Sequence, residues 1–404
     1  MSTRVATFAT FGVLLALWGC GSQSSAVFAT SGTGTWRALP PIPTPYDADG
    51  GIGGNLVEGS FQQSLFLDKG DVLAPITFEL GPAYTTTNGG ALSFDLKTNQ
   101  WKELLAGLFY PPNADGVLLW TGQEVILFGG SGCGVDDGPC GSHGVWNPST
   151  GVAHPISLVG APPFGSPSSV LWAGTRMIVI GAILEGDSGT TVVDSYTMYD
   201  PQTDTWTSMA APPTPCGGTV VWTGTEMLGW GGPSFLAYDP THDAWSTLPS
   251  VGQPTSRGGA AAVWTGTEMI IWGGATLLSN PPSGGPYQSA PLADGAAYNP
   301  TTKTWRSISA PNTGLQGPAA VWTGTEMLVW GGYDDYHCGG AADCPGSNLG
   351  YRYNPTTDQW QYITSVNAPG PRTGPGAVWT GTSLMIWGGY QALGAATDGA
   401  QWVP

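Results

Sequence analysis

The sequence predicts an all-β fold, a seven-bladed β-propeller made of four-stranded antiparallel blades. Three observations lead to this prediction: one phrase occurs six times, a second phrase recurs with a constant internal spacing, and the two chain ends complement each other. A repeat of this kind is typical of folds in which each unit buries its apolar surface against neighbouring units.

The first phrase, as in VWTGTEMIIWGG, is a tryptophan, a Thr-Gly turn and an apolar run that ends in glycine. Glycine at the first central position favours a type II′ hairpin. That turn pairs Thr265 with Glu268 and places Trp264 opposite Met269. Both faces of the hairpin are then apolar, so neighbouring sheets must cover both, as in a propeller. The six tryptophans that begin the phrase are Trp120, Trp172, Trp222, Trp264, Trp322 and Trp379.

The second phrase, as in YNPTTKTW, separates an aromatic residue from a tryptophan by seven positions and predicts a second hairpin. Counting the strands that this phrase ends gives seven blades. The blade between about Asp49 and Trp101 is degenerate, because it lacks the first phrase. The C-terminal DGAQWVP stops before its fourth strand, and the N-terminal TGTWRALP matches the missing strand. We therefore expect the N-terminal strand to close the ring by pairing with the C-terminal blade.

These two phrases resemble the kelch repeat, and the resemblance covers nearly the whole chain after residue 35. It implies a kelch propeller similar to the central domain of galactose oxidase. Because a single propeller uses residues 36–404, we expect one folded domain, preceded by a signal peptide (1–19) and a flexible tether (20–35).

Composition limits the partners. The net charge of −17 argues against nucleic acid, whose binding requires Lys and Arg to neutralise phosphates. The 63 glycines and 35 prolines fit short strands joined by many turns. The 19 tryptophans could stack on carbohydrate, but their repeat positions favour packing between blades. We expect a monomer.

The N-terminus predicts export. Arg4 precedes an apolar stretch that is too short for an ordinary membrane span and is typical of a signal peptide. Leu17-Trp18-Gly19-Cys20 resembles a bacterial lipobox, although Trp18 stands where a small residue is usual. The expectation is a lipid anchor on Cys20 in the periplasm, outer membrane or cell surface; the alternative is a simple secreted protein.

Four further cysteines fit an exported protein. Cys133 and Cys140 form one close pair and Cys338 and Cys344 another, so two small-loop disulfides are expected. No pair has CxxC spacing, so zinc is not expected. Cys216 has no partner in this scheme.

Strand alternation places the short, uniform turns on one face and the connections of variable length on the other, which is the expected ligand face. Five side chains could point at the channel mouth there, and opposed carboxylates and guanidinium groups suit a sugar or a sugar acid. The alternative is that Arg257 and Arg372 brace loops against aspartates. The five candidates are Asp49, Asp115, Arg257, Gln316 and Arg372.

Two enzyme classes provide comparisons. The kelch copper radical oxidases use a cysteine at a first-strand entry, cross-linked to a tyrosine at the next entry. Cys216 matches that cysteine, but Arg257-Gly258-Gly259 contains no tyrosine, and the later entries LQGPAAVW and RTGPGAVW contain no His or Tyr. Copper is therefore not expected, and Cys216 is interpreted as a small buried residue.

The second comparison is with the kelch sugar mutarotases. A resemblance to them implies sugar mutarotation, with Asp49 or Asp115 as acid or base and the two arginines holding a carboxylate. We favour instead a binding module without a cofactor, whose partner on the variable face is a carbohydrate or a protein. A calcium site would have to come from four acidic residues without an EF-hand pattern, and none is expected. These are Asp47, Asp49, Asp136 and Asp137.

Overall fold

The structure is a computed structural model. The described residues are 32–40, 66–68, 71–80, 86–109, 117–128, 143–162, 169–186, 189–216, 218–231, 234–277, 289–334, 346–391, 394–396 and 398–404.

Within these residues the strands form seven four-stranded antiparallel sheets. One sheet contains β2 (Phe66–Asp68), β3 (Asp71–Leu80), β4 (Thr86–Asp95) and β5 (Gln100–Phe109). The next contains β6 (Val117–Trp120), β7 (Val125–Phe128), β8 (Gly144–Trp146) and β9 (Ala153–Pro155). It is followed by β10 (Ser169–Trp172), β11 (Met177–Gly186), β12 (Gly189–Asp200) and β13 (Thr205–Ser208).

The remaining sheets continue in chain order. They contain β14 (Thr219–Trp222), β15 (Met227–Gly231), β16 (Ser234–Asp239) and β17 (Ala244–Thr247); then β18 (Ala261–Trp264), β19 (Met269–Trp272), β22 (Gly295–Asn299) and β23 (Thr304–Ile308); then β24 (Ala319–Trp322), β25 (Met327–Trp330), β26 (Gly350–Asn354) and β27 (Gln359–Ile363). The closing blade contains β28 (Gly376–Trp379), β29 (Leu384–Trp387), β32 (Gly399–Val403) and β1 (Thr35–Ala38). Two short hairpins extend from the ring, β20–β21 (Ala275–Leu277 and Ser289–Pro291) and β30–β31 (Tyr390–Gln391 and Gly394–Ala395).

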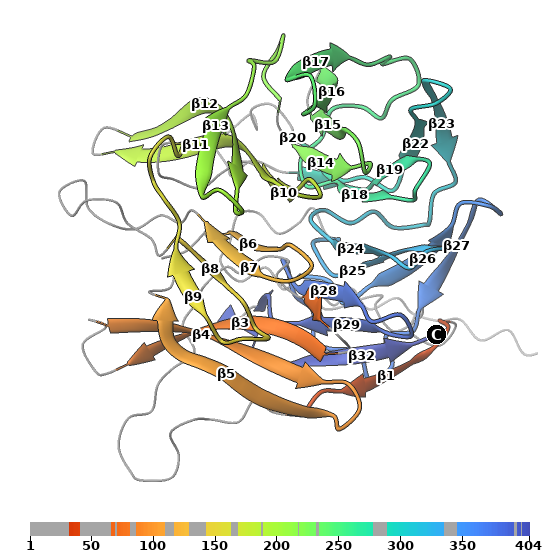
Figure 1. The fold of residues 1–404 in the computed structure, drawn as a ribbon. Coiled ribbons are helices and arrows are strands. Elements are labelled where there is room, and N and C mark those ends of the chain that lie inside the picture. The colour runs from red at the N-terminus through yellow and green to blue at the C-terminus, as the bar shows by residue number, and fades with distance from the viewer. Residues whose placement is uncertain are drawn as a thin grey trace, which may run out of the picture.

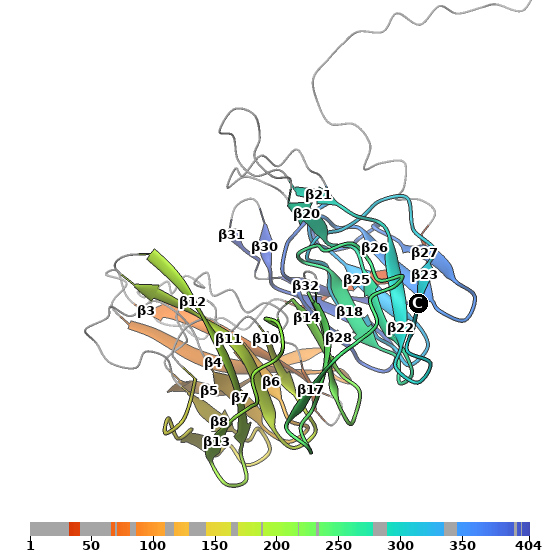
Figure 2. The same ribbon diagram turned by 90° about the horizontal axis from the view of Figure 1, so that it is seen from above.

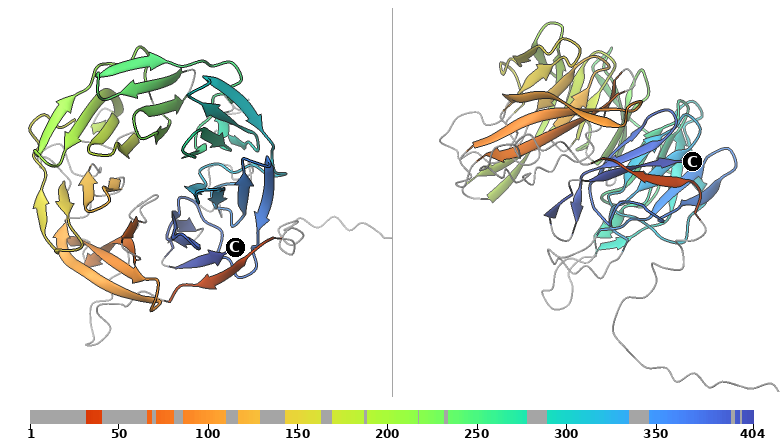
Figure 3. Two further views of the ribbon diagram at one scale, coloured as in Figure 1. Left: turned by 45° about the vertical axis from the view of Figure 1, so that its right-hand side comes forward. Right: turned by 90° about the horizontal axis from the view of Figure 1, so that it is seen from below.

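The sheets are arranged as the blades of a propeller (Figures 1 and 2). In the left view of Figure 3 they follow one another in chain order around a common centre. The first strands contact one another in the order β6, β10, β14, β18, β24 and β28, and β2 contacts β28. The predicted all-β propeller of four-stranded antiparallel blades is confirmed.

The expected count of seven blades requires a correction. Six blades carry the first phrase of the repeat, whereas the sheet β2–β5 carries only the second phrase, from Phe94 to Trp101. Its strands β3, β4 and β5 are each ten residues long, and the β4–β5 pairing shifts register twice. Its first hairpin lacks the tryptophan and the Thr-Gly turn that standardise the others. This sheet nevertheless touches the closing blade, where the rings of Trp101 and Trp387 meet edge-on with centroids 4.6 Å apart.

The hairpin register is as predicted. Trp264 pairs with Met269, and the Thr265 backbone N–H donates to Glu268 O at 3.0 Å. Gly266 has a φ of 96°, a value that a type II′ turn needs at its first central residue and that glycine adopts without strain. Met269 and Ile270 are fully buried, on opposite faces of the strand. Both faces of the hairpin are therefore covered by neighbouring blades.

Ring closure is also as predicted. Strand β1 pairs antiparallel with β32, with Trp36 opposite Trp402. The Trp402 indole N–H donates to Thr33 O at 2.9 Å, and the Trp36 indole N–H donates to Thr364 O. Gly34 has a φ of 78° and lies so close to the Trp402 ring that a Cβ would clash with it. The N-terminal strand thus completes the last blade.

The hydrophobic core lies between blades. The cluster that joins the β10–β13 blade to the β14–β17 blade takes Ile180 and Met198 from one and Met227 and Leu236 from the other. Tryptophans of the second strands fill such interfaces completely, as expected from the repeat; examples are Trp230, Trp272 and Trp330. The tryptophans that end the first strands are less buried than those of the second strands, since they are only half-buried. They lie at the rim of the interfaces.

Antiparallel connectivity gives the ring two faces. The first-to-second and third-to-fourth turns form one, which we call the turn face. The second-to-third connections and the links between blades form the other, the long-loop face. No helix in the described part of the chain has the length and hydrophobicity needed to span a bilayer.

Candidate functional site

The channel-mouth residues expected from the sequence fall into two groups. Asp49 and Asp115 lie outside the described residues. Arg257, Gln316 and Arg372 are described, and they precede the first strands β18, β24 and β28 on the long-loop face. Their contacts decide whether they are free to bind a ligand.

Arg257 is committed to its own blade. Its guanidinium binds both carboxylate oxygens of Asp294, with Nη1–Oδ1 2.7 Å and Nη2–Oδ2 3.0 Å. Nη1 also donates to the carbonyls of Gly273 and Asp294, and the remaining donors reach Thr255. The Arg257 side chain is 1% exposed, whereas that of Asp294 is 59% exposed. The Arg257 guanidinium holds the pKa of the Asp294 carboxyl below its usual range.

Arg372 repeats this arrangement in the closing blade. Its Nη2 donates to Asp398 Oδ1 at 2.8 Å, and Nη1 donates to the carbonyls of Gly388 and Asp398. Nε donates to Gly370 O at 3.0 Å. Burial lowers the pKa of Arg372, and the charge of Asp398 opposes that shift. In both blades one arginine joins the entry of the first strand, the end of the second and the start of the third.

The blade between these two uses an apolar version of the same contact. In the β24–β27 blade, Leu315 stands in place of the arginine and Leu349 in place of the aspartate. Leu315 is fully buried, and Leu349 packs against the same cluster. The backbone contact is retained, since Gly331 N–H donates to Leu349 O at 3.0 Å, as Gly273 N–H does to Asp294 O at 3.2 Å. The arginine–aspartate pair and the leucine pair are therefore alternative ways of making one structural clamp.

This geometry bears on the two roles that the sequence left open for Arg257 and Arg372. Their donors are occupied by protein acceptors, and their guanidinium groups are withdrawn from solvent. The two arginines brace loops against aspartates, which is the alternative that the sequence left open. They are not positioned to grip the carboxylate of a sugar acid.

Gln316 lies at the entry of β24. Its backbone exchanges two hydrogen bonds of 2.8 Å with Tyr333. The next residue, Gly317, donates its N–H to Gly259 O of the neighbouring blade at 2.7 Å. The Gln316 side chain is half-buried and lies over Gly259, where a Cβ would approach its Cγ to 3.1 Å. Gln316 thus helps to link two first-strand entries.

Two grooves lie on the opposite face, the turn face. One, of about 500 Å³, separates the β6–β9 and β10–β13 blades, and the other, of about 470 Å³, separates the β10–β13 and β14–β17 blades. Thr175 and Gln202 line both, so the grooves meet across one blade. The first is lined by Thr121, Gly122, Gln123, Glu124, Trp172, Gly174, Thr175, Pro201 and Gln202. The second is lined by Ala173, Thr175, Arg176, Met198, Asp200, Gln202, Pro240 and Thr241.

These grooves combine one aromatic ring with neutral polar groups and paired charges. Trp172 is half-buried and presents part of its ring, and Gln123 and Gln202 supply exposed amides. Arg176 lies 3.6 Å from Asp200. These grooves were not predicted from the sequence, because the repeat tryptophans were assigned to the core as a class. A usable signal was Arg176, which stands where four other copies of the phrase carry glutamate.

No protein-family model matches the chain, and no curated protein matches it. Among solved structures, the chain is similar to a novel fungal alcohol oxidase with catalytic diversity among the AA5 family, in complex with copper. The TM-score is 0.60 at 14% identity, and the match covers 88% of this chain and 76% of that one. The chain has the propeller fold of these oxidase structures. At this identity the likeness concerns the fold alone.

The first-strand entries that the structure describes do not supply the tyrosine and histidine that a copper site of the oxidase kind would need. The described first-strand entries hold Cys216, Gly258, Gln316 and Thr373 at equivalent positions, with one thiol and no imidazole or phenol among them. No group of three His, Cys, Asp or Glu in the described residues is placed to hold a metal.

Cys216 itself belongs to the interblade core, as predicted for a small buried residue. Its thiol lies over Gly229, where an added Cβ would come within 2.7 Å of Sγ. Other blades carry a larger residue at the position of Gly229, such as Ile271 or Val329. Burial raises the pKa of the Cys216 thiol to about 11, so the thiol is protonated at neutral pH.

The other cysteines and acidic residues singled out in the sequence lie outside the described residues. They are Cys20, Cys133, Cys140, Cys338, Cys344, Asp47, Asp136 and Asp137.

Proposed function

We propose that this protein is an exported binding module that holds a carbohydrate chain in the two grooves of the turn face. The observation that carries the proposal is the composition of the first groove, which Trp172 lines together with Gln123 and Gln202. Sugar rings have an apolar face that packs on aromatic rings and hydroxyl groups that need hydrogen-bonding partners at their edges.

The length of the combined groove favours an oligomeric ligand. The two grooves meet at Thr175 and Gln202 and together cross parts of three blades. The pairing of Arg176 with Asp200 leaves no unpaired cation in the second groove, which favours a neutral chain over a sugar acid. The sugar mutarotase alternative relied on Arg257 and Arg372 to hold a carboxylate. Because both arginines are occupied, no observation favours that activity.

The same proposal includes the seventh blade, export, the lipid anchor and the disulfides. We propose that β2–β5 is the seventh blade of a kelch-type ring, which is supported by its four strands and its contact with the closing blade. Export, a lipid anchor on Cys20 and disulfides between Cys133 and Cys140 and between Cys338 and Cys344 rest on the sequence. With these features, the proposed location of the module is a bacterial cell envelope.

The test compares two tryptophans that hold the same position in different copies of the repeat. Trp172 lines a groove, whereas Trp264 lines neither of the two. Binding of neutral oligosaccharides is measured by calorimetry against the purified protein. We expect Trp172→Ala to weaken binding about tenfold, or about 1.4 kcal/mol, while Trp264→Ala keeps the affinity.

An independent variant guards against misfolding. Gln202 is exposed and lines both grooves, so Gln202→Ala should keep the fold and still reduce affinity. The proposal fails if no oligosaccharide binds, or if Trp264→Ala weakens binding as much as Trp172→Ala does.

A further inference from the structure

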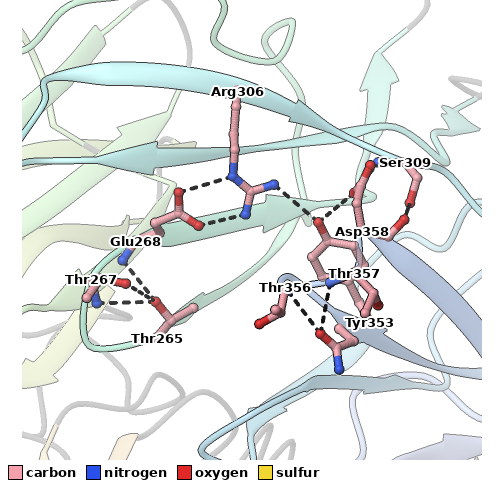
Figure 4. Close-up of polar contacts among 10 residues, drawn as sticks. Thr265, Thr267, Glu268, Arg306, Ser309, Tyr353, Thr356, Thr357 and Asp358 are labelled. Atoms are coloured by element: carbon pink, nitrogen blue, oxygen red, sulfur yellow. Dashed lines mark hydrogen bonds and ion pairs between the residues drawn. The ribbon is translucent and has the colours of Figure 1, made fainter.

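The junction between the β18–β23 and β24–β27 blades holds a continuous chain of polar contacts on the turn face (Figure 4). Glu268 binds Arg306 through both carboxylate oxygens, with Nε–Oε1 3.1 Å and Nη2–Oε2 2.6 Å. The third nitrogen of Arg306, Nη1, donates to the Tyr353 hydroxyl of the next blade at 3.3 Å. Tyr353 in turn donates to Asp358. Arg306 therefore fills the space between a carboxylate and a tyrosine.

The preceding junction lies between the β14–β17 and β18–β23 blades. It retains the carboxylate and the tyrosine of this series of contacts and lacks the arginine between them. Glu226 corresponds to Glu268, and Tyr298 corresponds to Tyr353. Ser246 stands where the next blade has Arg306, and Lys303 where it has Asp358. A short exposed serine cannot occupy the space that a guanidinium takes at the next junction.

The two retained ends lack partners. Tyr298 is fully buried, and its hydroxyl has no hydrogen-bond partner among the described residues. Among the described residues, the Glu226 carboxylate makes no hydrogen bond or ion pair. The carboxylates of Glu268 and Glu326 do make such contacts. Buried polar groups in native proteins are normally paired, so an unpaired one needs an explanation.

The charges around Glu226 favour a cation. Burial raises the pKa of Glu226, the nearby Asp239 raises it further, and Lys303 lowers it. Burial raises the pKa of Tyr298, and the negative charge of Glu226 raises it further, so the two groups interact across the junction. Glu226 and Asp239 are two carboxylates, and Lys303 supplies the single ammonium near them. Asp239 is also paired with His242 at 2.6 Å. A bound cation would relieve the repulsion and satisfy the tyrosine.

We propose that the junction formed by Glu226, Ser246 and Tyr298 binds a guanidinium group from outside the chain. A guanidinium is planar and can donate two parallel hydrogen bonds to a carboxylate while a further N–H reaches a hydroxyl. This is the geometry that Arg306 adopts one blade further on. The group comes from an arginine side chain of a partner protein or from a small guanidino compound.

The probe is methylguanidinium at millimolar concentration, followed by saturation-transfer NMR and by thermal shift. We expect it to bind the native protein about tenfold more tightly than methylammonium, which makes only a point contact with a carboxylate. Urea, which has the same planar shape without the charge, serves as the matched control and should not bind.

Variants locate the site. Ser246→Arg places the missing guanidinium on the chain and should abolish binding. Glu226→Gln removes the charge with little change of shape and should do the same, which keeps the test valid if Ser246→Arg does not fold. Arg306→Ser should create a second site of the same kind, so that methylguanidinium raises the melting temperature of this variant more than that of the native protein.

The two sources of the group are separated with a capped Gly-Arg-Gly peptide. An affinity about tenfold above that of methylguanidinium assigns the site to an arginine of a partner protein. Equal affinities assign it to a small compound. The proposal is overturned if methylguanidinium does not bind, or if Ser246→Arg and Glu226→Gln leave its binding unchanged. Neither result bears on Trp172 and the carbohydrate grooves, which lie at other junctions.

Discussion

The carboxylate of Asp358 accepts a hydrogen bond of 2.9 Å from the backbone N–H of Ser309, a residue of the preceding blade. The same oxygen accepts the Tyr353 hydroxyl at 2.7 Å, and Ser309 O accepts the Trp360 indole N–H. One aspartate and one tryptophan thus hold the end of the blade before them. We call this set of contacts the interblade latch.

The aspartate of the interblade latch occurs where the residue that it holds has a backbone N–H. Asp204 accepts the N–H of Ser157, and Asp243 accepts that of Ala210, both at 2.8 Å. The equivalent residue before the β18–β23 blade is Pro249, which has no N–H, and the position of the aspartate is taken by Lys303. Aspartate is present at these junctions where the preceding blade offers a donor.

Removal of the Asp358 side chain should destabilise the protein. Asp358→Ala leaves the Ser309 N–H and the Tyr353 hydroxyl without this acceptor, at an expected cost of about 2 kcal/mol. Lys303→Ala is the matched control, because both residues have positive φ, 52° and 56°, at the same turn position. Denaturant unfolding measures both. Equal losses in the two variants would mean that the latch contributes nothing beyond the turn.

The structural clamp of Arg257 and Asp294 can be exchanged for its apolar version. Asp294→Leu alone leaves a buried guanidinium without its counter-charge and should cost about 3–5 kcal/mol. The double variant Arg257→Leu with Asp294→Leu copies the pair Leu315 and Leu349 and should recover a large part of that loss. Thermal unfolding of the two variants and the native protein measures the coupling. If the double variant is no more stable than the single one, the clamps are not interchangeable.

Glu226 should make stability depend on pH in a defined direction. Its pKa is raised in the folded protein, by burial first and by Asp239 second. A carboxyl with a raised pKa favours the fold when protonated, so its contribution is lost as pH rises through the folded pKa. Glu226→Gln should therefore be more stable than the native protein at pH 7, with the gain vanishing below about pH 4.3. Chemical denaturation at both pH values measures it. A gain that persists at low pH would show another cause.

Cys216 and Gly229 should be coupled by size. Gly229→Ala brings a methyl group against the Cys216 thiol and should cost about 1–3 kcal/mol. The same substitution in a Cys216→Ala background should cost less, because the sulfur is gone. A double-mutant cycle of unfolding free energies measures the difference. Additive losses would mean that the thiol does not fill the space beside the glycine.

The fold could be predicted because local rules repeat. The type II′ turn at Gly266 fixes the pairing of Trp264 with Met269, and six copies carry the same information. Ring closure could be predicted because the fragment around Trp36 completes the fragment around Trp402. The sheet β2–β5 departs from the repeat, so nothing in the phrase could predict its ten-residue strands.

The site was less accessible to sequence reasoning. An arginine near a channel mouth suggests a ligand, and the partner that occupies Arg257 lies 37 residues further along the chain. The substitution of Leu315 and Leu349 for the arginine–aspartate pair was the available sign of a structural role. The unpaired Tyr298 hydroxyl depends on simultaneous changes at Ser246 and Lys303 in different strands and turns, and only the folded arrangement places them together.

The pairing of β1 with β32 has a mechanical consequence. Strand β1 is the edge strand of the closing blade, so a pull applied at Gly32 acts first on the backbone bonds of Thr33 with Tyr362 and Thr364 and then on the ladder from Thr35 to Ala38. Peeling this strand would break the hydrogen bonds one at a time rather than together. A force applied at this end would therefore open the ring between β1 and β32 before it disturbed the other blades.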